Sequence, residues 1–224
     1  TRWRRREEIK SFISMSANSL LILHGSGCEV QTGRLPVGTI VFFDSQERQV
    51  DELDMTGKVV LITGGSRGLG KAMALGFARH GANVAIVSRK IESCMETAKE
   101  VEACGVKAFP YAAHAGDWNS LDAMVEAVYE EFGKVDVLIN NAGMSPLYPS
   151  LDQVTEELFD KVIGVNLKGP FRLSANIGSR MAEGQGGCII NVSSIAAVQA
   201  SPGSEPYGAA KAGLNAITGS FAAA

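Results

Sequence analysis

The sequence lacks the residue groupings that metal sites and disulfide frameworks need. Its 224 residues include only 3 His and 4 Cys. The cysteines are Cys28, Cys94, Cys104 and Cys188, and they form no C-x-x-C pair and have no His cluster beside them. Structural zinc is therefore not expected, and we predict no metal site. This cysteine usage favours a reducing, cytoplasmic setting.

Long apolar runs and an excess of one charge are also missing. No run approaches the roughly 18 apolar residues of a membrane span. The basic start, Arg2 to Arg6, precedes an apolar stretch that Lys10 and several Ser interrupt, without a clear cleavage site, so we do not expect a signal peptide. The net charge of −3 gives no electrostatic reason for nucleic-acid binding. We expect neither a membrane nor a nucleic acid as partner.

A regular alternation of short apolar runs and helical patterns begins at Lys58. The apolar runs, which predict buried strands, are 58–63, 83–88, 106–111, 135–140 and 187–192. Helical patterns fall at 69–80, 92–103, 118–132, 155–182 (interrupted at Gly164 and at Gly169-Pro170) and around Tyr207. This order predicts an α/β domain with a Rossmann-type, doubly wound parallel sheet and helices on both faces.

The first 54 residues differ from the rest of the chain. They mix basic, Ser-rich and short apolar pieces, and we find no motif in them. The piece 39–43, after Pro36 and Gly38, could be a strand. We therefore divide the chain into an N-terminal extension of unknown role, 1–54, and a dinucleotide-binding domain, 55–224.

A glycine-rich turn lies between the first predicted strand of the domain and the following helix. It reads Thr63-Gly64-Gly65-Ser66-Arg67-Gly68-Leu69-Gly70. Glycine lets the backbone turn sharply and approach a ligand, and a helix N-terminus offers free N–H groups to a pyrophosphate. The spacing is G-x-x-x-G-x-G rather than G-x-G-x-x-G. Because this turn lies between a buried strand and a helix, a role in dinucleotide binding is favoured over a purely structural role.

The end of the second strand of the domain indicates which dinucleotide is bound. An acidic residue there would contact the ribose of NAD, whereas a basic one accommodates the 2′-phosphate of NADP. The chain has Ser88-Arg89 and no acid, and Arg67 adds a second guanidinium. The alternative is two solvated surface arginines. We predict NADP(H), with NAD(H) second.

Three further stretches place polar residues near the carboxyl ends of strands. Asn140-Asn141-Ala142-Gly143 ends the fourth strand of the domain, where a polar pair can tie strands together, contact the cofactor, or do both. Pro170 cannot donate to the carbonyl of Asn166, which leaves that carbonyl free for a water or only kinks the helix. Ser193-Ser194 ends the fifth strand, where a hydroxyl could reach a substrate or act as a cap.

Tyr207 and Lys211 lie four residues apart in an Ala-rich run, so they share one face of a predicted helix. A nearby ammonium favours the phenolate and lowers a tyrosine pKa from about 10. Such a tyrosine can exchange a proton with a substrate oxygen near neutral pH. Taken alone, the pair is a weak signal, because the same spacing arises by chance in many helices and then gives only a half-buried Tyr beside a solvated Lys.

Together these five motifs resemble the short-chain dehydrogenase/reductase family in its simple one-domain form. The resemblance covers about residue 55 to the end and extends to bacterial members such as 3-oxoacyl-(acyl carrier protein) reductase and gluconate 5-dehydrogenase. It implies an oxidoreductase that interconverts a ketone and a secondary alcohol, with a small-molecule carbonyl or alcohol substrate and a homo-oligomeric full-length form.

The resemblance also implies roles for individual residues. Tyr207 would be the general acid or base, Lys211 would lower its pKa and bind the nicotinamide ribose, and Asn166 would hold a relay water. Ser194, which stands 13 residues before Tyr207 as in the family, would bind the substrate oxygen. The expected cofactor-binding residues are Gly64, Ser66, Arg67, Gly68, Leu69, Gly70, Ser88, Arg89, Asn140, Ala142, Gly143, Tyr207 and Lys211.

The sequence departs from the family pattern in two places. The run Ala113-His114-Ala115-Gly116-Asp117 lacks the Asp expected directly after the third strand, so His114 or nearby backbone would have to contact the adenine. The family also has two more strands after the Tyr helix, so we expect the last strands to be missing. Two rival hypotheses stay open: a non-catalytic dinucleotide-binding protein or inactive fragment, and a sugar-nucleotide epimerase.

Overall fold

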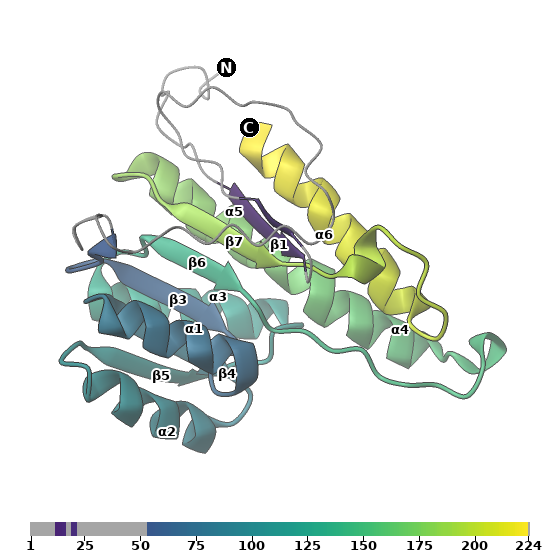
Figure 1. The fold of residues 1–224 in the computed structure, drawn as a ribbon, viewed down its shortest axis with the longest axis horizontal. Coiled ribbons are helices and arrows are strands. Elements are labelled where there is room, and N and C mark those ends of the chain that lie inside the picture. The colour runs from purple at the N-terminus through teal and green to yellow at the C-terminus, as the bar shows by residue number, and fades with distance from the viewer. Residues whose placement is uncertain (1–11, 17–18, 22–52, 224) are drawn as a thin grey trace, which may run out of the picture.

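One seven-stranded sheet forms the centre of the molecule (Figure 1). The computed structural model describes residues 12–16, 19–21 and 53–223. The strand order is β2-β1-β7-β6-β3-β4-β5. The strands are β1 (Phe12–Ser16), β2 (Ser19–Leu21), β3 (Val59–Thr63), β4 (Asn83–Ser88), β5 (Ala108–Ala112), β6 (Val137–Asn140) and β7 (Cys188–Val192).

The five strands from β3 to β7 are parallel and match the five predicted apolar runs. Every residue of β3 and β6 is buried. Leu61 at the centre of β3 pairs with Ala85 on one side and with Leu138 on the other. Continuous apolar strands of this kind are typical of a parallel sheet that is covered on both faces. The predicted fold class is confirmed.

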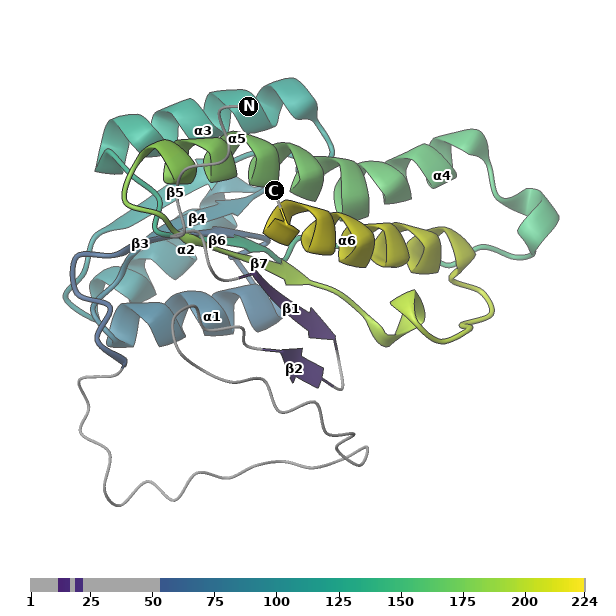
Figure 2. The ribbon, with the colours of Figure 1, turned by 90° about the horizontal axis from the view of Figure 1, so that it is seen from above.

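Helices cover both faces of the sheet, as Figure 2 shows from above. The helices are α1 (Gly68–Arg79), α2 (Ile91–Glu102), α3 (Trp118–Phe132), α4 (Glu156–Ile163), α5 (Gly169–Glu183) and α6 (Glu205–Ala223), with short 3-10 turns at Leu151–Gln153 and Ile195–Ala197. Among the described residues, no helix combines the length and the apolar character needed to cross a bilayer.

Two hydrophobic clusters lie on opposite faces of the sheet because side chains alternate along each strand. Leu61 and Leu138 pack against α3 and α5, in a cluster that includes Leu121 and Ile177. Val60, Ile62, Ile86 and Ile139 pack against α1 and α2 on the other face. This double burial fixes the carboxyl ends of β3, β4 and β6 along one edge, where the glycine turn lies.

The long helical region predicted over 155–182 is two α-helices joined by a π-helical turn, Gly164–Lys168. The Gly169 N–H donates to the Gly164 carbonyl, which is five residues back. A Cβ at Gly169 would lie 1.7 Å from the Ala115 carbonyl oxygen, so the loop after β5 packs directly on this turn. Asn166 lies within the turn, next to the loop after β6.

The sheet continues beyond β7 with strands from the first part of the chain. β1 pairs with β7 in parallel, with Ile13 opposite Ile190, and β2 pairs with β1 in an antiparallel manner. The sequence did not predict these strands, because 12–21 is short and interrupted by polar residues. The strand that the sequence did suggest in this segment, 39–43, lies outside the described residues.

Candidate active site

The glycine-rich turn between β3 and α1 has the backbone that a close ligand contact requires. Gly64 and Gly68 have φ values of 66° and 53°, a region that side chains disfavour. A Cβ at Gly70 would lie 2.2 Å from the Gly64 carbonyl oxygen, so only glycine fits there. α1 begins at Gly68 without a side-chain cap, which leaves its first N–H groups available to an anion.

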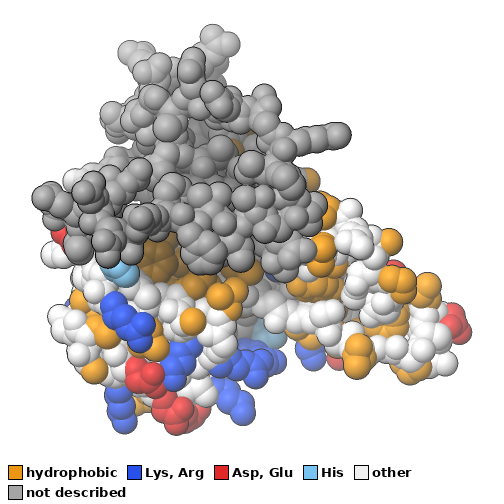
Figure 3. All heavy atoms as spheres, in the orientation of Figure 1, with side chains coloured by type: hydrophobic (Ala, Val, Ile, Leu, Met, Phe, Trp, Pro, Cys, Tyr) orange, Lys and Arg blue, Asp and Glu red, His pale blue; other side chains and the backbone are white. Residues whose placement is uncertain are grey.

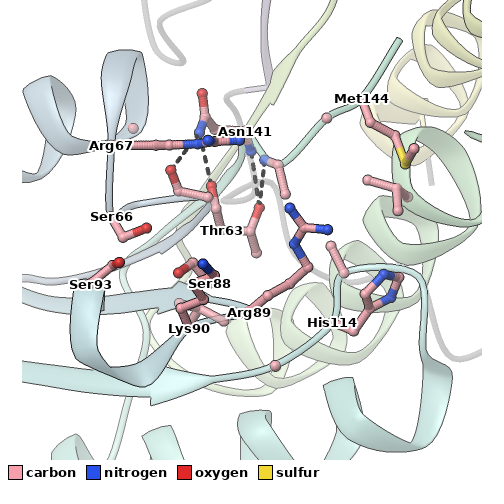
Figure 4. A pocket seen from close by; sticks show the side chains of 18 of the residues that line it. Thr63, Ser66, Arg67, Ser88, Arg89, Lys90, Ser93, His114, Asn141 and Met144 are labelled. Carbon is pink, nitrogen blue, oxygen red and sulfur yellow. Dashed lines mark hydrogen bonds between the residues drawn. The ribbon is translucent and has the colours of Figure 1, made fainter. Parts of the chain in front are cut away.

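Asn141 fixes the turn to the end of β6, as the dashed lines in Figure 4 show. Its Nδ2 donates to the carbonyls of Thr63 (3.0 Å) and Gly64 (3.2 Å). The Thr63 hydroxyl in turn accepts from the backbone N–H groups of Asn141 and Ala142, both at 3.1 Å. Thr63 and Asn141 were not among the predicted site residues; the sequence signal for Asn141 was its place in the Asn140-to-Gly143 stretch.

A cleft of about 570 Å³ opens along this edge of the sheet. Its lining includes ten of the predicted residues, namely Gly64, Ser66, Arg67, Gly68, Leu69, Gly70, Ser88, Arg89, Ala142 and Gly143. Lys90, Ser93 and His114 also line it, and Figure 4 shows them around the cleft. Lys90 follows Arg89 directly, and that adjacency was the available sequence signal.

The cleft is cationic along its lining. Arg67, Arg89 and Lys90 line it, and no Asp or Glu does so among the residues that the structure describes. Within 53–223 none of the three cations forms a salt bridge. Figure 3 shows Lys and Arg side chains over α1 and α2, the helices that follow the glycine turn and Arg89. Unpaired cations at a cleft suit a phosphate group.

Asn140 points away from the cleft, unlike its neighbours in the same stretch. Its Nδ2 donates to Asn191 Oδ1 (2.8 Å) and to the Ser174 hydroxyl (3.1 Å). Asn191 Nδ2 donates to the Thr218 hydroxyl (2.9 Å), whose own donation goes to the Leu214 carbonyl (2.7 Å). Asn140 therefore ties strands and helices together, and its predicted contact with the cofactor stays a prediction.

Lys211 is almost fully buried, with 3% of its surface exposed. Its Nζ donates to the Val192 carbonyl at the end of β7 (2.7 Å) and lies 5.8 Å from the centroid of the Tyr207 ring. Burial lowers the pKa of the Lys211 ammonium to about 8. At neutral pH a cation therefore stands beside the tyrosine, on the face of α6 that the four-residue spacing predicted.

Asn166 uses its side chain to hold the loop after β6. Its Nδ2 donates to the carbonyls of Met144 (2.8 Å) and Val162 (2.9 Å), and its Oδ1 accepts from the Met144 N–H (3.2 Å). A Cβ at Gly143 would lie 3.0 Å from Asn166 Oδ1 and 3.8 Å from Lys211 Nζ. Gly143 lines the cleft, so Asn166 and Lys211 lie directly behind its lining, whereas neither they nor Tyr207 line the cleft themselves.

Ser193 and Ser194 have different surroundings at the end of β7. The Ser194 hydroxyl is half-buried and accepts from the Ala196 N–H at 3.2 Å. The Ser193 hydroxyl is buried and has no hydrogen-bond partner among the described residues. The turn after Ser194 packs on α6, since a Cβ at Gly208 would lie 3.0 Å from the Ala196 carbonyl oxygen. Ser194 and Tyr207 thus lie in adjoining elements.

The comparisons with known proteins agree with this arrangement. A family model described as short chain dehydrogenase matches residues 58–224. A 3-oxoacyl-(acyl-carrier-protein) reductase of Thermotoga maritima is 38% identical over 168 residues, which are 75% of this chain and 68% of that protein. The reductase of the same name from Staphylococcus aureus is 37% identical over 166 residues, 74% of this chain and 67% of that protein.

Solved structures give the same result. A metagenomic short-chain oxidoreductase in complex with NADP has a TM-score of 0.72 and 32% identity, and the match covers 74% of this chain and 75% of that one. An NAD⁺-bound xylitol dehydrogenase has a TM-score of 0.70 and 27% identity, over 75% and 67% of the two chains. The chain spans about two thirds of the length of the curated relatives named above.

Proposed function

The chain belongs to the short-chain dehydrogenase/reductase family of NAD(P)-dependent oxidoreductases, and on that premise we propose that it interconverts a ketone and a secondary alcohol with NADP(H) as its preferred cofactor. The observation that carries the proposal is the place of Lys211. The Val192 carbonyl fixes its ammonium 5.8 Å from the Tyr207 ring centroid, next to Gly143 of the cleft lining. A buried cation beside a phenol suits proton exchange with a substrate oxygen.

The residues of the cleft fit a dinucleotide. The close approach of Gly70 to Gly64 leaves no room for a side chain, and the uncapped start of α1 faces the same space. Backbone N–H groups of Ser66, Gly68, Leu69 and Gly70 would hold the pyrophosphate there. Ala142 and Gly143 would border the nicotinamide side, and His114 the adenine side. When bound, the cofactor supplies or accepts the hydride.

The preference for NADP(H) rests on Arg67, Arg89 and Lys90. The relatives named above include one bound to NADP and one bound to NAD⁺, so family membership leaves the choice open. In this chain the end of β4 carries no carboxylate that would accept from a ribose 2′-hydroxyl, and the cations nearby would attract a 2′-phosphate. Two guanidinium groups can each bind a phosphate through two N–H donors.

The proton chemistry belongs to α6 and to the end of β7. In reduction, Ser194 donates a hydrogen bond to the substrate oxygen, and Tyr207 donates the proton that this oxygen gains as the alcohol forms. The charge of Lys211 stabilises the Tyr207 phenolate left behind. A water on the Asn166 carbonyl and the Lys211 ammonium return a proton from solvent to Tyr207. In oxidation the same groups act in reverse.

The family and the composition indicate the substrate class and the location. The substrate is a small carbonyl or alcohol compound, as membership of the family implies. We place the protein in the cytoplasm on its cysteine usage, and Cys94, Cys104 and Cys188 are free thiols in the described part of the chain.

A fluorescence titration with NADPH and NADH, followed by a panel of carbonyl compounds, tests this function. The panel should contain 3-oxoacyl thioesters and cyclic and sugar-like ketones. We expect NADPH to bind at least about tenfold more tightly than NADH, since charged hydrogen bonds to the 2′-phosphate are at stake. We also expect NADPH oxidation with at least one ketone. Absence of binding would support the inactive-fragment hypothesis, and binding without turnover would support the non-catalytic one.

A further inference from the structure

Beyond Ala142, hydrogen bonds hold the loop between β6 and the 3-10 turn at Leu151 at two further points. We call residues 141–150 the β6 loop; Figure 1 shows it as the segment that leads from β6 toward α4. Its first tie is the Asn166 side chain, which bonds both the N–H and the carbonyl of Met144. Its second tie is Tyr148, which reaches the start of α6. Between the ties, Leu147 is 93% exposed and packs on nothing.

Tyr148 and Glu205 form a reciprocal contact. The Tyr148 hydroxyl donates to Glu205 Oε2, and the Glu205 backbone N–H donates to the same hydroxyl oxygen at 3.0 Å. Glu205 Oε1 accepts from the Gly203 N–H at 3.1 Å, so the carboxylate is held from its other side too. The hydrogen bond from Tyr148 is the main reason why the pKa of Glu205 lies below its usual value. A side chain of the β6 loop thus caps the helix that carries Tyr207.

The contact holds the β6 loop against the start of α6. A narrow crevice there is lined by Ser145, Pro146 and Tyr148 from the β6 loop, by Ser204, Pro206 and Tyr207 at the start of α6, and by Leu158 and Val162 of α4. Release of Tyr148 would free the second half of the β6 loop, because the other hydrogen bonds named above hold only Asn141, Ala142 and Met144 in its first half. Glu205 stands two residues before Tyr207 in α6. Because the Tyr148 hydroxyl accepts from the Glu205 N–H, its release would also uncap the start of this helix.

We propose that Tyr148 and Glu205 form a latch that fixes the β6 loop beside Tyr207 and thereby positions the carbonyl substrate; this rests on the proposed function. Both are positioning residues, since neither needs to touch the reacting atoms. The latch acts on the substrate side alone, because the cofactor cleft is lined by Gly143 and Met144 of the loop, before its free part. A surface hydrogen bond with only a structural role would change stability slightly and leave kinetics unchanged.

The substitutions Tyr148→Phe and Glu205→Ala remove the latch from either side. We expect each to raise KM for the carbonyl substrate about fivefold to tenfold, with kcat within about twofold and NADPH affinity unchanged. The double variant should raise KM no more than the more affected single variant does, because both substitutions remove the same contact. Glu205→Gln keeps an acceptor oxygen and should restore most of the wild-type KM.

Matched controls and a second readout separate the outcomes. Tyr129→Phe in α3 and Glu96→Ala at an exposed position of α2 change the same residue types in helices that do not adjoin the β6 loop, and should leave KM unchanged. Hydrogen exchange of 144–150 should become faster in Tyr148→Phe and Glu205→Ala with NADPH bound. Unchanged exchange, or faster exchange with wild-type KM, would overturn the latch. Wild-type protein without any turnover would instead contradict the proposed function on which the latch depends.

Discussion

The buried ammonium of Lys211 links the stability of the fold to pH. Below about pH 8 this lysine is charged in both the folded and the unfolded chain, so folding bears the whole cost of burying the charge. Between about pH 8 and its ordinary pKa of 10.5, only the unfolded chain holds the proton. Because the unfolded state then binds more protons, the contribution of Lys211 to stability rises with pH over this window.

The substitution Lys211→Met isolates this effect. From pH 7.5 to about 10.5, the unfolding free energy of wild type should rise relative to that of the variant by about 3 kcal/mol. This follows from about 1.36 kcal/mol per unit of pKa difference. Urea unfolding of the cofactor-free proteins at several pH values measures it. Lys134→Met, at an exposed lysine, is the control. A difference that stays constant with pH would show that burial does not lower the pKa of Lys211.

Arg89 is the residue whose loss should most affect the choice of cofactor. We expect Arg89→Ala to weaken NADPH binding about 10- to 100-fold, the value of one charged hydrogen-bonded pair, and to leave NADH binding within about twofold. Arg79→Ala removes the same charge from the far end of α1 and serves as the control. Equal losses of affinity for NADPH and NADH would mean that Arg89 does not face the 2′-phosphate.

Single residues of the site differ in how far the sequence could predict them. Tyr207 and Lys211 were predictable because helical spacing alone puts them on one face. Asn140 was not, because the sequence shows that a polar pair ends β6 but not which of the two amides turns inward. Tyr148 and Glu205 are 57 residues apart, and no local pattern joins them, so their contact depends on tertiary packing.

At the scale of elements, α6 is anchored to the sheet by a buried polar chain. Asn140, Asn191 and Thr218 connect β6, β7 and α6 through hydrogen bonds of 2.8 and 2.9 Å. All three residues are buried. Since buried amides need partners, this chain and the bond from Lys211 to Val192 set the position of α6 against β7.

Thr218→Val should break this chain while keeping the shape of the side chain. Asn191 Nδ2 would lose its partner in a buried place, which costs about 1–3 kcal/mol of unfolding free energy. Thr218→Ser keeps the hydroxyl and loses one methyl group, so about 0.8 kcal/mol is expected. Urea unfolding compares the two. A Val variant as stable as the Ser variant would show that the hydrogen bond does not anchor α6.

The elements were largely predictable because glycine and apolar runs mark their limits. The strand 83–88 and the helix 118–132 were placed without error, and Gly133 ends that helix at a φ of 74°. The π-helical turn was seen only as an interruption. The turn packs on the Ala115 carbonyl at Gly169, and no pattern within one helix indicates a contact with a distant loop.

At the scale of the whole molecule, the position of β1 beside β7 was beyond prediction. Pairing between residues so far apart leaves no local signature, and a strand of five residues carries a weak signal. The outer face of α6 is marked in the sequence by its lack of charge. Between 206 and 223 the only charged residue is Lys211, which is buried, and the exposed positions include Ala209, Ala212 and Ala216.

We expect this face of α6 to form an interface between copies of the chain. This face carries no charged side chain, so an interface there would bury no unpaired charge. Light scattering with size-exclusion chromatography should show a homo-oligomer that Ala216→Glu dissociates, because the charge would be buried without a partner. Ala72→Glu, on an exposed position of α1, is the control. A monomeric wild type would contradict the expectation.

The most direct test of the account is the turnover of Tyr207→Phe with NADPH and a carbonyl substrate that wild type reduces. The variant keeps the ring and loses only the hydroxyl that donates the proton. We predict that kcat falls by at least about 100-fold, the contribution of a general acid, while NADPH affinity and thermal stability stay near those of wild type. Wild-type turnover in Tyr207→Phe would contradict the assigned chemistry.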